Sequence, residues 1–238
     1  MPAPQWNRGH RIPPLLVTSQ EDTGDPAAIP ASQPQPPEPP PSSLDRPKEC
    51  INKYPTPAFS LLCTMMDRMR SEEASKRRDT LIRFLGLWRV KVGNDLYPLI
   101  RLLLPDRDRE RPVYNLKEAM LAKCYIEVLG LDKHSEGALR LVKWKQPVDG
   151  QAESHSGDFA RVCYHEIAAR STIEEGQLSI EAVNALLDQL ATGRLRQHDY
   201  VPILRKINQQ CTPVEQEWII RIILKDLRIS IREKGVFA

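Results

Sequence analysis

The chain has 238 residues, of which 41% are hydrophobic, 34 are basic and 31 are acidic, giving a formal net charge of +3. This length allows one large domain or two small ones with a substantial core. The net charge is too small to indicate nucleic-acid binding, so that function has to be judged from the distribution of the charges. No apolar run approaches the roughly 20 residues of a membrane span. The apolar segment IPPLLV near the N-terminus is short and contains two prolines, which argues against a secretory signal.

Residues 1–52 are predicted to be a disordered, proline-rich extension. Most of the 21 prolines lie there, including the run QPQPPEPPPSS at 33–43. Proline favours polyproline II and is excluded from helix interiors and central strands, and this segment offers little to bury. A ligand for an SH3-like domain is the alternative to a solvated tail. Residues 53–238 are predicted to form a single all-α globular domain.

Helical periodicity predicts about nine or ten helices after this extension, and no segment alternates as a strand for more than a few residues. The first two helices are expected at about 57–70 and 75–92. A short helix in NDLYPLIRLLLP should end at Pro105, and the charged segment DRDRERPVY that follows should be a loop. The further helices are expected within the segments 115–131, 135–144, 158–170, 178–193, 199–211 and from 213 onward.

Three helix starts carry specific signals. Asp158 and Ser179 are expected to be N-caps, because their side-chain oxygens can accept a hydrogen bond from the first turn. Thr212 and Glu215 form a capping box with Pro213 at the first helical position. Pro202 is expected in the first turn of its helix. Residues 146–157 are rich in turn-forming residues and should be a flexible loop.

The sequence shows no catalytic or metal-binding signature. The five cysteines are odd in number, widely spaced and without a CxxC pair, which predicts reduced thiols in the cytosol or nucleus. Cys163 and His165 are interpreted as packing residues, because a pair lacks half of the usual zinc ligands. There is no GxxxxGK[ST], GxSxG, HExxH or GxGxxG. PVDG at 147–150 departs from the nucleotidyl-transfer motif K-x-D-G, because proline stands at the position of the nucleophilic lysine.

The last helix is predicted to be central to the fold. Apolar residues, including Trp218, cover most of its circumference. Only the face with Glu217, Arg221, Lys225, Arg228 and Arg232 is expected to be left for water or a ligand, as one stripe at the helical repeat. The alternative is that these cations complement the helix dipole and pair with Glu217 or Asp226.

Several segments resemble the N-terminal DNA-binding domain of the DNA ligase IV family, the ATP-dependent DNA ligases of end joining. The resemblance covers about residues 57–238. It is carried by LYPLIRLLLPDRDRER (96–111), KEAMLAKCYIEVLGL (117–131), GDFA (157–160), LSIEAVNALLDQLA (178–191) and VEQEWIIRIILKDLRISIREKGVF (214–237).

The resemblance implies an all-helical domain that helps to encircle nicked duplex from the minor-groove side. It makes Arg221, Lys225, Arg228, Arg232 and Lys234 the candidate phosphate contacts. Gly157 and Asp158, at a helix start, are secondary candidates, with an N-cap as the alternative role of Asp158. Ser230 stands where the family pattern has glycine, so it is expected either to bond a phosphate or to hold the strand further away.

The resemblance also carries expectations about partners and chemistry. This chain alone should be catalytically inert, because it has no K-x-D-G lysine, and ATP and Mg²⁺ would belong to the parent ligase in the nucleus. An XRCC-type scaffold partner would bind only a C-terminal region outside this sequence. The first two helices could receive a peptide of an Artemis-type nuclease, with Phe59, Met66, Phe84 and Trp88 lining the groove. The rival interpretation is a helical protein–protein scaffold without DNA contact.

Overall fold

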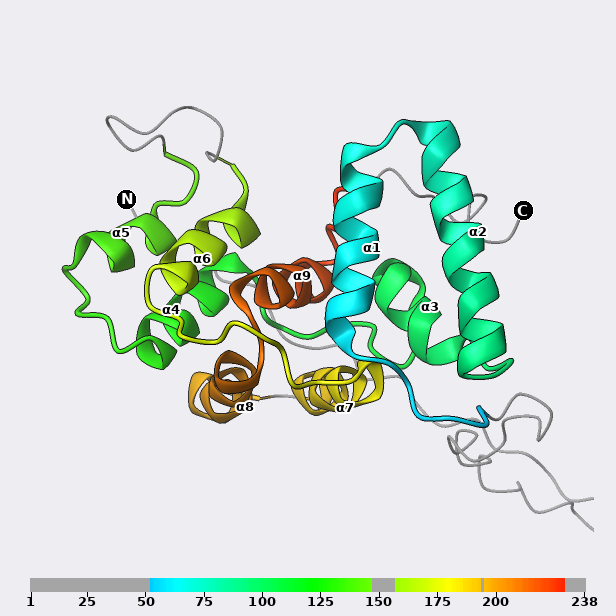
Figure 1. Cartoon of the computed structure of the whole chain (residues 1–238). Helices are drawn as coiled ribbons and strands as arrows, with labels where there is room; N and C mark the ends of the chain where they lie inside the picture. Colours follow the sequence, from blue (N-terminus) through cyan, green and yellow to red (C-terminus); the bar gives the residue numbers. More distant parts are fainter. Residues whose placement is uncertain (1–51, 147–156, 194, 230–238) are drawn as a thin grey trace, which may run out of the picture. The chain divides into compact units, whose positions relative to one another are not determined.

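The computed structural model describes residues 52–146, 157–193 and 195–229, which contain α-helices and one 3-10 helix but no β-strand (Figure 1). The all-α fold class is therefore confirmed. The helices are α1 (Phe59–Ser71), α2 (Ala74–Lys91), α3 (Tyr97–Leu103), η2 (Pro105–Arg107), α4 (Glu118–Val128), α5 (Glu136–Val142), α6 (Phe159–Ala168), α7 (Ile180–Ala191), α8 (Gln197–Gln210) and α9 (Pro213–Leu224). The extension 1–51 and PVDG at 147–150 lie outside the described residues, so the domain boundary stays a prediction.

Local sequence signals fix the starts of three helices that the sequence predicted. The side chains of Asp158, Ser179 and Thr212 each accept a hydrogen bond from a backbone N–H of the first turn of α6, α7 and α9. Glu215 Oε2 also accepts from the Thr212 backbone N–H at 2.7 Å, which closes the capping box. These three predictions are confirmed.

The start of α8 differs from the expectation. Asp199 accepts a hydrogen bond from the backbone N–H of Arg196 at 2.8 Å, so the helix begins at Gln197 and Pro202 lies inside it rather than in its first turn. A proline at this position cannot donate to the carbonyl four residues earlier, and its ring crowds that carbonyl. The buried residues Tyr200, Leu204 and Ile207 supply the packing that holds the helix despite this loss.

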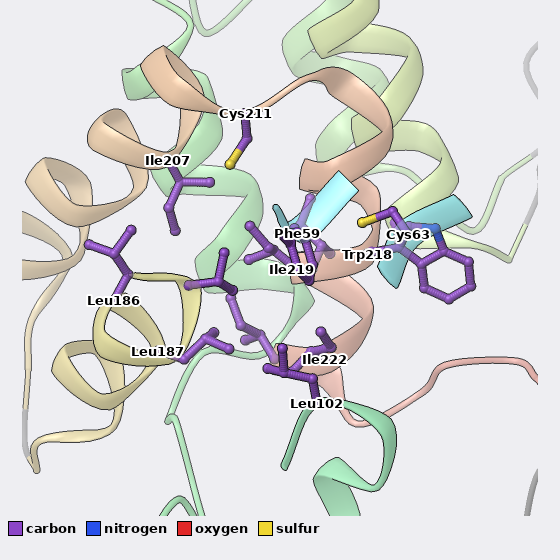
Figure 2. Packing of buried hydrophobic residues seen from close by; sticks show 14 of the residues in the cluster. Phe59, Cys63, Leu102, Leu186, Leu187, Ile207, Cys211, Trp218, Ile219 and Ile222 are labelled. Carbon is purple, nitrogen blue, oxygen red and sulfur yellow. The ribbon is translucent and has the colours of Figure 1, made fainter. Parts of the chain in front are cut away.

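Helix α9 forms the centre of the core. It packs against α6 and α1, and it lies between them in Figure 1. Figure 2 shows its side chains Trp218, Ile219 and Ile222 in one cluster with residues of α1, α3, α7 and the α8–α9 region. Trp218 and Ile219 are 0% exposed. The prediction that this helix is central is confirmed.

The segment after α3 has no regular structure beyond the 3-10 helix Pro105–Arg107, so the predicted loop is largely confirmed, but two of its charged side chains are buried. Asp108 and Arg111 are buried, and Asp108 Oδ2 accepts hydrogen bonds from Arg101 Nε at 3.0 Å and Arg111 Nε at 2.6 Å. Arg111 Nη2 donates to Asn184 Oδ1 of α7 at 2.8 Å. Buried ions require such partners, and here they come from three separate segments, so the pattern of one segment could not reveal them.

The thiols of Cys63, Cys124, Cys163 and Cys211 are free and buried. Burial raises the pKa of Cys163, which suits the packing role that was predicted for it. His165 is exposed and makes an edge contact with Tyr164, so the prediction that it is a packing residue was wrong. Within the described ranges, no helix is both long and apolar enough to cross a membrane.

Candidate nucleic-acid interface

The basic residues at the end of the chain do not form a single helical stripe. Helix α9 ends at Leu224, and Lys225 follows in the left-handed conformation with φ of 57°. Arg228 is also left-handed, with φ of 51°. The expectation of one continuous helical face through residue 232 was therefore wrong, because the chain leaves the helix after Leu224. We call residues 225–229 the terminal turn.

Tertiary contacts set the end of α9. The Lys225 ammonium donates to the backbone carbonyls of Arg111 and Pro112, each at 3.0 Å. Those carbonyls belong to the segment that Asp108 and Arg111 anchor in the core. A left-handed residue with a Cβ is unfavourable by itself, so these contacts compensate for it. No glycine in the sequence marked this stop.

Arg221 is 3% exposed and does not face water. Its Nη2 donates to Asp158 Oδ2 at 2.7 Å and to Glu217 Oε1 at 2.9 Å. Its guanidinium also lies over the Trp218 ring, 5.8 Å from the centroid. The expectation that Glu217 and Arg221 lie on a solvent-exposed face was wrong, because α6 and α1 cover it. Arg221 joins α9 to the start of α6.

Glu217 is the centre of this buried cluster. Its carboxylate accepts from Arg70 of α1 at 2.9 Å and from Arg161 of α6 at 3.0 Å, in addition to Arg221. Burial alone would raise the pKa of Glu217, but the hydrogen bonds and charges of Arg221 and Arg70 outweigh it, so the pKa lies below its ordinary value. One carboxylate thereby ties three helices together.

Asp158 connects this buried cluster to the surface. Its Oδ1 accepts from the Arg161 backbone N–H at 3.3 Å, which confirms its N-cap role. Its Oδ2 faces Arg221 and also Arg228 Nη1, the latter at 3.3 Å. Burial opposes its ionisation, but Arg221 and Arg228 hold the pKa of Asp158 below its ordinary value.

Arg228 is the exposed cation of this site, with 44% of its side chain accessible. Its Nη2 donates to the Gly157 carbonyl at 2.8 Å, and its Nε donates to Asp226 Oδ2 at 3.1 Å. The structure thus brings together Gly157, Asp158, Arg221 and Arg228, residues that the sequence analysis named separately. Ser230, Arg232 and Lys234 lie outside the described residues.

Sequence reasoning missed three members of the site, Arg70, Arg161 and Asp226, of which Arg70 contacts Glu217. Arg161 joins Glu217 and stacks on Tyr164 at 4.4 Å, and Asp226 faces Arg228. Arg161 lies one turn after a predicted N-cap, where a basic residue gives no functional signal. Asp226 had been considered only as a general partner of the basic residues. Its alignment with Arg228 depends on a left-handed backbone that the sequence does not predict.

A second feature is an apolar groove between α1 and α2, with a volume of about 450 Å³. Phe84 and Trp88 line it, together with Leu61, Met65 and Leu87. Phe59 and Met66 are fully buried in the core and do not line it, so that part of the expectation was wrong. Leu61 and Leu87 are more than half exposed, which gives the groove an accessible apolar rim.

The described part of the chain contains no group of three or more His, Cys, Asp or Glu side chains that could hold a metal ion. Its ionised carboxylates at the site are instead paired with arginines. The fold and the site together define an all-helical module with a cationic turn at its surface.

The chain belongs to the DNA ligase N-terminus family, whose model matches residues 58–238. It is 64% identical over 196 residues to a DNA ligase 4 of Cryptococcus neoformans, covering 82% of this chain and 18% of that protein. It is 42% identical over 184 residues to a DNA ligase 4 of Coprinopsis cinerea, covering 77% and 18%. It is 39% identical over 163 residues to a DNA ligase 4 of Emericella nidulans, covering 68% and 16%.

These matches confirm the resemblance to an N-terminal domain of DNA ligase IV. The chain spans less than a fifth of the length of the relatives it matches, between 16% and 18% for the three named above.

Proposed function

We propose that this chain is the DNA-binding module of an ATP-dependent DNA ligase that acts in non-homologous end joining in the nucleus. It holds nicked duplex through phosphates and does not read the base sequence. Family membership supports the ligase assignment, because the relatives carry the name DNA ligase 4. The single structural observation that supports a phosphate contact is the exposed Arg228 in the terminal turn.

The geometry of Arg228 suits a phosphate. Arginine presents a planar fork of N–H donors that matches two phosphate oxygens. Each guanidinium nitrogen of Arg228 has one protein oxygen near it, which orients the plane, and each Nη group keeps a second N–H. A contact of this kind positions a protein on duplex of any sequence, as the sealing of breaks requires. We include Lys225, Ser230, Arg232 and Lys234 in the proposed contact surface as its neighbours in the chain, and Gly157 because its carbonyl accepts a hydrogen bond from Arg228.

We assign the chemistry of sealing to other parts of a parent ligase. The sequence has no K-x-D-G lysine, so this chain should not form a lysine–AMP bond from ATP and Mg²⁺. An XRCC-type scaffold partner would likewise bind elsewhere. The role proposed for this chain is binding and orientation of the duplex.

The test is fluorescence anisotropy of the 238-residue chain with labelled nicked and intact duplexes of several sequences. Binding should be independent of sequence and should weaken steeply with added salt, because phosphate contacts release counterions. Arg228→Ala should weaken binding to every duplex and lower the salt slope by about one. Arg205→Ala, which removes the same charge from an exposed position on α8, is the matched control and should change both quantities less.

Flat anisotropy at low salt would contradict this function and favour the second candidate, a helical protein–protein scaffold. The apolar groove between α1 and α2 is the observation in its favour. In that case Arg228 only pairs with Asp226 and Asp158. A peptide of an Artemis-type nuclease is the occupant that the family resemblance suggests for the groove, and it is compatible with either function.

A further inference from the structure

The exposed Arg228 contacts Asp226 of its own turn and two residues at the start of another helix, Gly157 and Asp158. Lys225 and Arg228, two residues with a Cβ, are both left-handed within the terminal turn. Such a backbone persists only where surrounding contacts determine it. The Lys225 ammonium holds one end of the turn through the carbonyls of Arg111 and Pro112. At the other end, Arg228 contacts the start of α6 through Gly157 and Asp158.

Of the carboxylates near Arg228, Asp158 has the more ordered position. Its side chain is 16% exposed, and it is fixed by the Arg161 backbone N–H and by the buried Arg221. Asp226 is 58% exposed and lies on the turn itself. An exposed ion pair is screened by water and constrains its partner weakly. Of the two carboxylates that contact the Arg228 guanidinium, Asp158 is therefore the one that the fold fixes more firmly.

The distances indicate that Asp158 orients Arg228 more than it neutralises it. Its Oδ2 lies 2.7 Å from Arg221 Nη2 and 3.3 Å from Arg228 Nη1. The shorter, charge-assisted contact goes to the buried arginine. The charge of Asp158 is thus shared with Arg221, so Asp158 cancels less of the Arg228 charge than an unshared carboxylate would.

We propose that Asp158 is a positioning residue for phosphate binding, which connects the buried Arg221 to the exposed Arg228 and holds the Arg228 fork toward the duplex. This inference rests on the proposed DNA-binding function. It gives Asp158 an indirect role through Arg228, without contact with the DNA. It also gives Arg221 a role as the buried support of Asp158.

The test is a double-mutant cycle on DNA affinity in the 238-residue chain, with Asp158→Asn and Arg228→Ala. Asn is as good an N-cap as Asp, so α6 should keep its start. Asp158→Asn should weaken binding of a nicked duplex roughly three- to tenfold at low salt, the range of coupling between neighbouring charged groups. It should also reduce the salt slope toward that of Arg228→Ala. In the Arg228→Ala background, the same substitution should change the dissociation constant by less than about twofold.

The sign of the effect separates positioning from general electrostatics. Asp158→Asn makes the protein more positive, and long-range attraction alone would strengthen DNA binding. Asp199→Asn is the matched control, because Asp199 also accepts a backbone hydrogen bond at a helix start and lies on α8. It should leave the affinity unchanged or slightly higher. The melting temperature of each variant is measured alongside, and Asp158→Ser, which also caps a helix, replaces Asp158→Asn if that variant does not fold.

Tighter binding by Asp158→Asn, or an equal loss in both backgrounds, would overturn this inference and leave the proposed function standing. Failure of the wild-type chain to bind any duplex at low salt would overturn both. Loss of binding that depends on Arg228 would support the positioning role.

Discussion

At the scale of single residues, Trp218 and Arg228 differ in burial although they lie only ten positions apart. Trp218 is buried under the guanidinium of Arg70, which lies 5.1 Å from the ring centroid, and under that of Arg221. Arg228, in contrast, is exposed to solvent. The difference follows from the end of α9 at Leu224, which lies between them, because the non-helical backbone of the terminal turn places Arg228 at the surface while Ile229 remains buried.

Trp218→Ala should destabilise the domain by roughly 3–5 kcal/mol, because it removes a large buried ring and leaves a cavity among α1, α6 and α9. Urea denaturation followed by circular dichroism measures this loss. Val90→Ala, at a position that is 79% exposed on α2, is the control and should change the free energy of unfolding by less than about 0.5 kcal/mol. Similar values for the two variants would contradict the central position of Trp218.

At the scale of elements, α2 is the described helix that buries the smallest share of its residues. Only Thr80, Leu81 and Trp88 are buried among its residues. Its interior also contains Gly86, where an added Cβ would meet nothing within 4 Å. Neither packing nor backbone conformation requires this glycine in the folded state, so its cost to the helix is uncompensated among the described residues.

Gly86→Ala should therefore stabilise the protein by about 0.5–1 kcal/mol, since alanine has the higher helix propensity and reduces the freedom of the unfolded chain. Thermal denaturation is the measurement. Gly137→Ala in α5 is the matched variant with the opposite expectation. A Cβ there would stand 2.5 Å from Glu166 Oε2 and disturb its contacts with Arg140 and Arg170. A loss of stability in Gly86→Ala would show that α2 needs the glycine.

At the scale of the whole molecule, buried carboxylates paired with arginines connect helices that are distant in sequence. Asp158 joins α6 to α9, and Glu217 joins α1, α6 and α9. Asp108 joins Arg101 of α3 to Arg111, which donates in turn to Asn184 of α7. Burial alone would raise the pKa of each carboxyl group, but the arginines outweigh it and lower all three below their ordinary values. The stability of the fold should therefore depend on pH.

The direction of that dependence follows from linkage. These pKa values are lower in the folded than in the unfolded state. At pH values between the two, the unfolded chain binds more protons than the folded chain, so the free energy of unfolding rises with pH. The contribution is complete above the ordinary carboxyl range and is lost as pH falls from about 5 through the folded values. Urea denaturation between pH 7 and pH 3 tests this. Glu217→Gln should make the free energy of unfolding depend less on pH. A free energy of unfolding that does not change between pH 7 and pH 3 would contradict the prediction.

The sequence by itself determined the features that act within one helical turn or along one helix. The capping box of Thr212 and Glu215, the N-caps Asp158 and Ser179, and the burial of Trp218 follow from local hydrogen bonding and apolar periodicity. The order of the helices and the all-α class follow from the same signals. The resemblance to DNA ligase IV was likewise carried by contiguous motifs.

Tertiary structure alone decided which charged residues are buried and where α9 ends. Arg221 meets Asp158, 63 positions away, and Glu217 meets Arg70, 147 positions away. The helix ends before Lys225, whose ammonium donates hydrogen bonds to the backbone carbonyls of Arg111 and Pro112. A cation on a helix has the same local pattern whether it faces water or a distant carboxylate. Only the approach of α1, α6 and the 108–112 segment removes the water and supplies the partner. This is why, among the described residues, the predicted cationic stripe divides into a buried Arg221, a half-buried Lys225 and an exposed Arg228.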